Sequence, residues 1–140
     1  ITIPSKEIKF EYRKSNIPED LIFLSASFKG KKSSRENIFK TTNDLKVEKE
    51  KNQPTKIKTS GSTFKNPITQ TEKKVWELIK MSVSLNQTFG DACISKKHCN
   101  FFVNKGNATF EDMKKLIDYV SNEVLKKTGI NIEKEIKILE

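Results

Sequence analysis

The heptapeptide GSTFKNP, from Gly61 to Pro67, combines residue types that suit the binding of an anionic small molecule. Ser62 and Asn66 carry short polar groups that lose little side-chain entropy when they are ordered. Lys65 adds a point positive charge. Gly61 allows a ligand to approach the backbone closely, and Pro67 fixes the chain just beyond. This GSTFKNP segment therefore predicts an anion-binding site rather than a part of the core.

Glu135 is a second candidate, because it lies among isoleucines that alternate with charged residues near the end of the chain. Two interpretations of this carboxyl group are open. The simpler one is a carboxylate that faces solvent on a half-buried strand. The functional one is a carboxyl group directed into a cleft, where burial favours its neutral, proton-donating form.

His98 is the only histidine, and Cys93 and Cys99 lie close to it in the sequence. A metal site needs three or four ligands at fixed spacing, and the sequence supplies no fourth one here. A catalytic Cys–His pair is equally weak, because adjacent residues of a strand point to opposite faces. We expect no metal, and the roles of these three residues stay open.

The net charge of +9 is high for 140 residues and attracts phosphates, carboxylates or nucleic acid. Neither a GxGxxG motif nor a phosphate-binding loop is present. Lysine and glutamate are interleaved, and most aromatic residues occupy positions explained by core packing, so no basic stripe is visible. We therefore expect no nucleic-acid partner.

Membrane and secretory signals are not found in the sequence. No run of 18 or more apolar residues occurs, and no signal peptide is visible. With two cysteines and no secretory signal, we expect reduced thiols and a cytoplasmic location. The chain opens on Ile1 in a strand-like pattern, which indicates a fragment whose beginning lies elsewhere.

In the first half of the chain, the apolar–polar alternation of residues 8–12 predicts a half-buried strand. The β-forming residues of 21–28 predict a second strand. Spaced apolar residues in the polar segment 33–51 indicate a surface helix. Residues 55–60 form a basic connector, which is a plausible domain boundary.

The second half has clearer patterns. We predict a helix at 70–82 and strands at 91–95 and 101–104. A second helix is predicted between Thr109 and Gly129, and a last strand across Ile132, Ile136 and Ile138. Thr109 and Asp112 form a capping-box-like pair, and Gly129 is a C-cap candidate. The expected fold class is α+β, with a three-stranded sheet and two helices in this half.

Several separated motifs occur in order: GSTFKNP, WELI from Trp76, GDA from Gly90, SKKHCNFFVN from Ser95, GNAT from Gly106 and EIK from Glu135. Together they resemble the C-terminal part of the UDP-N-acetylenolpyruvoylglucosamine reductase family, flavoenzymes of bacterial peptidoglycan precursor synthesis. Residues 10–15 and 18–23 are similar to the end of its flavin-binding region. The resemblance implies that residues 1–55 end an α+β FAD-binding domain and that 56–140 form a small α+β substrate-binding domain.

The resemblance also implies a reaction. In the family, NADPH reduces FAD, which passes hydride to the enolpyruvyl double bond of UDP-N-acetylglucosamine enolpyruvate, and a proton then completes UDP-N-acetylmuramate. The serine of the GSTFKNP motif is the proton donor, here Ser62. The arginine of the Tyr-Arg motif, here Arg13, pairs with the substrate carboxylate. Glu135 matches the glutamate that stabilises the enolate.

Tyr12, Lys65 and Asn66 match positions at the substrate site, so the resemblance implies that they bind substrate. The glycine-rich part that holds FAD in the family has no counterpart here, so no residue is assigned to the cofactor. We expect the chain to need that N-terminal part as a partner. The alternative is a basic module without catalysis that binds UDP-sugars or nucleic acid.

Overall fold

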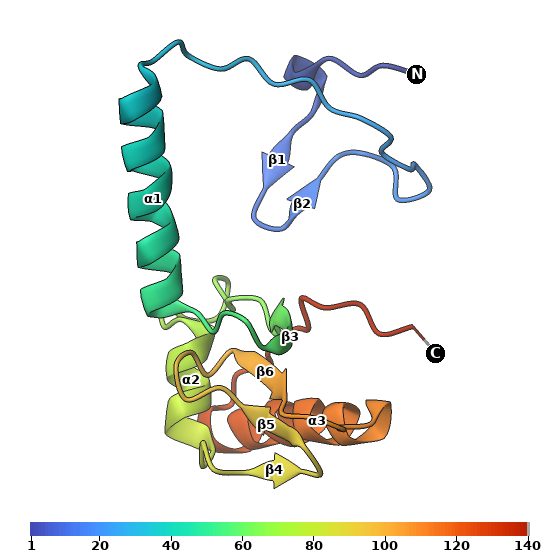
Figure 1. The fold of residues 1–140 in the computed structure, drawn as a ribbon. Helices are drawn as coiled ribbons and strands as arrows, with labels where there is room; N and C mark the ends of the chain where they lie inside the picture. The colour runs from blue at the N-terminus through green and yellow to red at the C-terminus, as the bar shows by residue number, and fades with distance from the viewer. Residues whose placement is uncertain (140) are drawn as a thin grey trace. The chain divides into compact units, whose positions relative to one another are not determined.

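The computed structural model describes residues 1–139 and divides the chain into two compact units, Ile1–Ile38 and Phe39–Glu140. Figure 1 shows the elements of both units in chain order. The boundary between the units falls within a helix, Arg35–Asn52. The predicted division into 1–55 and 56–140 stays a prediction.

The first unit contains a 3-10 turn, η1 (Ser5–Glu7), and a small antiparallel hairpin of β1 (Phe10–Glu11) and β2 (Lys14–Ser15). The side chain of Asn16 supports the hairpin, because it accepts from the Lys9 N–H at 2.8 Å and donates to the Glu7 carbonyl at 3.2 Å. The strand predicted over 8–12 is thus confirmed only at its centre, and its predicted half-burial is wrong, because both residues of β1 are exposed.

The strand predicted over residues 21–28 is wrong, since this stretch has no regular structure. Ile22, Phe23 and Leu24 are 71–92% exposed. High β-propensity reflects packing on a half-buried pleated surface, and a strand also needs a neighbour for its backbone groups. Neither condition is met within the described residues.

Helix α1 (Arg35–Asn52) confirms the surface helix that the sequence predicted. None of the side chains in residues 35–52 is buried. The Asn37 N–H donates to Ser34 Oγ at 3.2 Å, which satisfies one of the free donors of the first turn. Residues 1–139 contain no membrane-crossing helix, because each helix there is too short or too polar.

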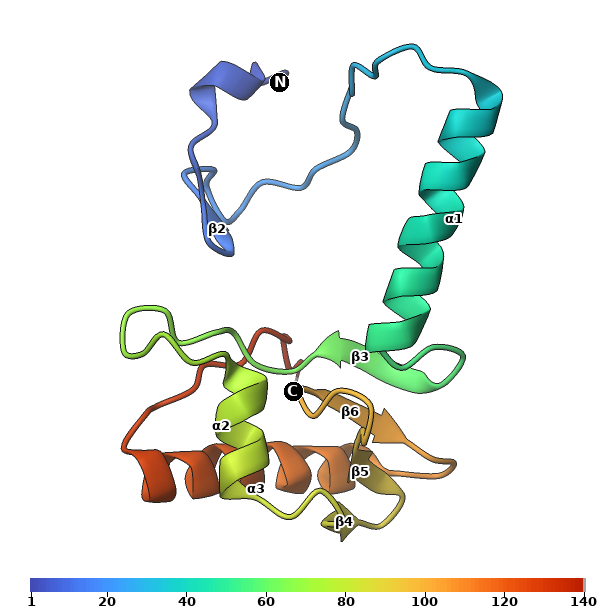
Figure 2. The same ribbon diagram turned by 90° about the vertical axis from the view of Figure 1, so that its left-hand side faces the viewer.

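The second unit is built on a sheet whose described strands follow the order β3-β6-β5-β4 and are all antiparallel. These strands are β3 (Lys58–Ser62), β4 (Thr88–Phe89), β5 (Ala92–Ile94) and β6 (Phe101–Asn104). Two helices, α2 (Val75–Ser82) and α3 (Phe110–Thr128), pack against each other beside it (Figure 2). The predicted α+β class is confirmed.

The sheet differs in three ways from the three-stranded one that was predicted. The connector at 55–60 continues into β3, the edge strand next to β6. At the other edge, β4 pairs with β5, although no strand was predicted at residues 88–89. The predicted last strand is reduced, in the described residues, to one isolated bridge between Phe64 and Lys134. Ile132 is 3% exposed and still packs on the core, so the alternating pattern reported burial correctly but not strand pairing.

The core lies between the sheet and the two helices. It is formed by apolar side chains that the two helical stripes and the strands contribute, among them Phe64, Leu78, Ile79, Ile94, Phe102, Leu116, Ile117, Val120 and Val124. The rings of Phe64 and Phe102 meet edge to face, with 5.9 Å between their centres. Phe64 belongs to the GSTFKNP segment, so this segment is anchored in the core.

Both predicted caps of α3 are confirmed. The Asp112 N–H donates to Thr109 Oγ1 at 3.1 Å, and the Thr109 N–H donates to Asp112 Oδ2 at 2.9 Å. The hydrogen bonds from Thr109 lower the pKa of Asp112. Gly129 closes the helix with φ of 72°, a conformation that glycine adopts without strain.

Replacing Thr109 by Ala should lower the free energy of unfolding by about 1 kcal/mol, because the Asp112 N–H loses its acceptor. Thr109→Ser keeps the hydroxyl and should stay near the wild type. Urea unfolding of the two variants, followed by circular dichroism, checks this expectation. Equal stability of the Ala and Ser variants would mean that the capping box does not hold α3.

Candidate active site on the GSTFKNP segment

Ser62 lies at the end of β3, just after an irregularity in the sheet. Thr59 is opposite Val103, whereas Ser62 is opposite Phe101, so β3 contains one residue more than β6 between these pairs. Such a bulge bends the strand and redirects the side chains that follow. Gly61 lies within it with φ of 90°, which a residue with a Cβ adopts only with strain.

The backbone beyond Ser62 is held on one side by Asn100. The Thr63 N–H donates to the Asn100 carbonyl at 2.8 Å, and the Phe64 N–H donates to Asn100 Oδ1 at 3.0 Å. In return, Asn100 Nδ2 donates to the Phe64 carbonyl at 2.9 Å. Asn100 is 4% exposed, and reasoning from the sequence missed its role. The available signal was an amide residue between Cys99 and Phe101, directly before an apolar strand.

The opposite side of the same backbone is held by the end of the chain. The Glu135 N–H donates to the Thr63 carbonyl at 2.8 Å, and the Lys65 N–H donates to the Glu133 carbonyl at 2.8 Å. These two bonds flank the isolated bridge between Phe64 and Lys134. They bring Glu135, which is half-buried, alongside the residue that follows Ser62.

Lys65 and Asn66 also have structural partners. Lys65 Nζ forms an ion pair with Glu133 Oε2 at 3.3 Å, and both side chains are partly exposed to solvent. Asn66 Oδ1 accepts from the Val75 N–H at 2.9 Å, at the first residue of α2. The segment therefore connects the sheet to the beginning of this helix.

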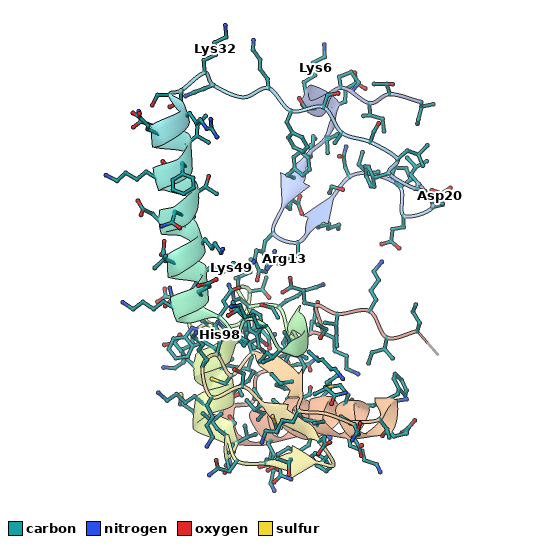
Figure 3. All side chains as sticks on the ribbon, in the orientation of Figure 1. Lys6, Arg13, Asp20, Lys32, Lys49 and His98 are labelled. Atoms are coloured by element: carbon teal, nitrogen blue, oxygen red, sulfur yellow. The ribbon has the colours of Figure 1, made fainter. Side chains whose placement is uncertain are left out.

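Tyr12 and Arg13 lie together in the first unit, at the turn between β1 and β2, and Figure 3 shows Arg13 there. The Arg13 guanidinium lies over the Tyr12 ring, 5.5 Å from its centre. Arg13 has φ of 58°, which is uncommon for a residue other than glycine. Within the second unit, main-chain hydrogen bonds place Glu135 beside Thr63, one residue after Ser62, and Lys65 beside Glu133. Tyr12 and Arg13 belong to the first unit.

His98 and Cys99 have structural partners in the turn before β6. The Asn100 N–H donates to His98 Nδ1 at 3.3 Å, and Cys99 Sγ donates to the Trp76 carbonyl at 3.3 Å. Burial lowers the pKa of His98 and raises that of the Cys99 thiol. Among residues 1–139, no group of three histidine, cysteine or acidic side chains is arranged to hold a metal ion.

The described residues also form a shallow pocket of about 280 Å³ beside β5 and β6. Its lining mixes aliphatic side chains such as Ile57 and Leu85 with the cations Lys96 and Lys105. None of the predicted site residues lines this pocket. The site residues predicted in the second unit lie away from this pocket, on the GSTFKNP segment and at Glu135.

The protein-family model for the C-terminal domain of UDP-N-acetylenolpyruvoylglucosamine reductase matches residues 53–139. The chain belongs to this family. The reductase of Pelagibacter ubique is 65% identical over 138 residues, which cover 99% of this chain and 46% of that protein. The reductase of Rickettsia typhi is 41% identical over 98% of this chain and 45% of that protein.

A crystal structure of the reductase from Thermus caldophilus matches with a TM-score of 0.73 and 30% sequence identity. The match covers 94% of this chain and 46% of that chain. It confirms the α+β fold. The chain thus spans a little less than half the length of the relatives it matches.

His98 should titrate below its ordinary pKa of 6.5, because burial disfavours the imidazolium. The free energy of unfolding should then be fully retained above 6.5 and fall as the pH drops from 6.5 toward the folded-state pKa. NMR titration of this single histidine, with denaturant unfolding between about pH 5 and 8, measures both effects. His98→Asn should flatten this part of the stability profile. A folded-state pKa at or above 6.5 would contradict the expectation.

Proposed function

We propose that this chain forms the substrate side of an enzyme that reduces UDP-N-acetylglucosamine enolpyruvate to UDP-N-acetylmuramate. The reductant is NADPH, used through FAD, and the reaction serves peptidoglycan precursor synthesis in the cytoplasm. The main support is the pairing of Glu135 with Thr63, next to Ser62. This hydrogen bond brings together two regions that are distant in the sequence. The family resemblance gives proton donation to Ser62, in the first region, and enolate stabilisation to Glu135, in the second.

In this proposal Ser62 donates the proton that completes the reduced lactyl group. A serine hydroxyl is a weak acid, so it serves only against a strongly basic carbanion or enolate in a site screened from water. The position of Ser62 fits this requirement. It is partly buried, follows a bulge, and precedes two residues that are 0% and 1% exposed, Thr63 and Phe64.

Glu135 stabilises the enolate in this proposal, best as a neutral acid that donates a hydrogen bond to the oxygen where charge develops. Its main-chain bond to Thr63, the residue after Ser62, supports a place for Glu135 at this site. Arg13 would pair with the substrate carboxylate through its planar guanidinium fork, which lysine lacks. Its left-handed backbone conformation at the hairpin turn is consistent with a presented functional side chain.

The remaining contacts are assigned to substrate binding. Lys65 would exchange its partly exposed partner Glu133 for an anionic group of the substrate, an exchange that costs little because exposed ion pairs are weak. Asn66 Oδ1 accepts from the N–H of Val75, the first residue of α2, so this amide lies next to the positive end of a helix. Tyr12 would support Arg13 through the ring contact already described.

The described residues contain no glycine-rich loop of the kind that holds FAD in the family, because their glycines lie singly. We therefore propose that FAD is held mainly by a segment that corresponds to the rest of the relatives' length. No step through the flavin is assigned to residues of this chain.

The alternative of a basic binding module without catalysis finds less support. The family match covers residues 53–139 and extends to relatives that are named as reductases. Lys65 and Lys134 are engaged in ion pairs with Glu133 and Asp118 within the unit. The reductase proposal accounts for the arrangement of Ser62 and Glu135, and the binding module does not.

Ser62→Ala tests the proton donor in a chimera in which this chain replaces the matching part of the Pelagibacter ubique reductase. Flavin reduction by NADPH should be unchanged, whereas flavin reoxidation by the enolpyruvyl substrate should slow by roughly 10²–10⁴-fold. Stopped-flow absorbance separates the two half-reactions. Ser60→Ala removes a hydroxyl from the same strand and should alter neither. Normal reoxidation in Ser62→Ala would refute the assignment.

Glu135 is tested in the same chimera by comparing two substitutions. Glu135→Gln keeps a neutral hydrogen-bond donor and should retain part of the reoxidation rate. Glu135→Ala removes the donor and should lose roughly 10²–10³-fold. If the Gln variant is as slow as the Ala variant, the role of Glu135 as a neutral donor is wrong. A wild-type reoxidation rate in the Ala variant would mean that Glu135 has no role in this step.

A further inference from the structure

Where β6 begins, the regular pairing with β3 gives way to pairing with one amide side chain. Ser62 is opposite Phe101, and the next pair along the ladder is Thr63 with the main chain of Asn100. One residue further, the described hydrogen bonds give Phe64 no main-chain partner on the β6 side. The carboxamide of Asn100 takes that place, since it accepts from the Phe64 N–H and donates to the Phe64 carbonyl.

The strip of residues 63–65 therefore has a partner on each edge. On one edge Asn100 supplies all the hydrogen bonds described above. On the other edge Glu135 and Glu133 supply one main-chain bond each, both at 2.8 Å. Ser62 is attached to the beginning of this strip, and Glu135 is bonded to its first carbonyl. The bonds on the two edges together fix where Ser62 and the main chain of Glu135 lie on the sheet.

Asn100 itself is held in place by hydrogen bonds of the turn that precedes β6. Its N–H donates to His98 Nδ1, and the Phe101 N–H donates to the His98 carbonyl at 2.9 Å. The neighbouring Cys99 thiol donates to the Trp76 carbonyl of α2. The side chain is 4% exposed, so water does not compete for its two polar atoms.

We propose that Asn100 is a positioning residue for the proposed reaction, and that its carboxamide holds Ser62 in the geometry required for proton donation beside Glu135. This inference rests on the function proposed above. A carboxamide is needed because it offers one donor and one acceptor without charge. An aspartate would lose the donor to the Phe64 carbonyl and bury a charge.

The test uses the reductase chimera and a matched control on the same strand. The Asn100 side chain makes two hydrogen bonds, both with Phe64, whereas that of Asn104 makes three, with Gly106 and Ala108. Asn100→Ala should leave flavin reduction by NADPH unchanged and slow reoxidation by the substrate by roughly 10–100-fold, the expected effect of a misplacement of about 1 Å. Asn104→Ala removes one hydrogen bond more and should still not affect reoxidation selectively. Equal rates in the two variants would overturn the proposal.

A double variant separates positioning from general damage. If Asn100 acts through Ser62, then adding Asn100→Ala to Ser62→Ala should cause no further loss of reoxidation rate. An additional loss as large as that in the single Asn100→Ala variant would overturn the proposal. If Ser62→Ala alone leaves reoxidation normal, the proposed function fails first, and this outcome is distinguishable from a failure of Asn100.

Two further measurements cover the case in which Asn100→Ala fails to fold in the chimera. Asn100→Asp keeps an acceptor for the Phe64 N–H and regains a donor when the acid is protonated, so its reoxidation rate relative to wild type should rise as the pH is lowered. A ratio independent of pH would count against the proposal. In this same variant, hydrogen exchange at Phe64 should be faster than in the wild type, and unchanged exchange would overturn the proposal.

Discussion

The hydrogen bond from the Glu135 N–H to the Thr63 carbonyl, 2.8 Å long, joins the two parts of the chain on which the candidate site depends. Its companion, from the Lys65 N–H to the Glu133 carbonyl, has the same length. The residues 63–65 thus have main-chain partners in residues 133–135 on one edge. On the other edge, the pairing with β6 ends after the bulge, and the side chain of Asn100 takes the place of a strand at Phe64.

The elements that the sequence predicted well are those whose signals are local. Helix α3 is predicted by the Thr109–Asp112 capping box, an apolar stripe and Gly129, all within one stretch of chain. Strands β5 and β6 are short apolar runs around a polar turn, and the structure places them where the pattern does. In each case the residues that define the element also contain the information about its ends.

The predictions that failed concern strands, because strand pairing depends on residues far away in the sequence. Residues 21–28 have strong β-propensity but meet no neighbour in the described chain. Residues 58–62 look like a polar connector, yet pairing with β6 makes them a strand. The candidate site shows the same limit. The nearness of Glu135 to Ser62, and the role of Asn100, follow from tertiary pairing that no local pattern encodes.

The GSTFKNP segment combines a polar site with a buried position, and this combination explains its residue types. Phe64 is 1% exposed and packs on Phe102, which holds the segment in the core. Burial then requires partners for the polar groups of its backbone, and Asn100 with residues 133–135 supplies them. Thr63 Oγ1, also buried, lacks a partner within the described structure, a cost of about 1–3 kcal/mol. The aromatic anchor and the paired backbone offset that cost and keep Ser62 at a fixed place on the edge of a rigid unit.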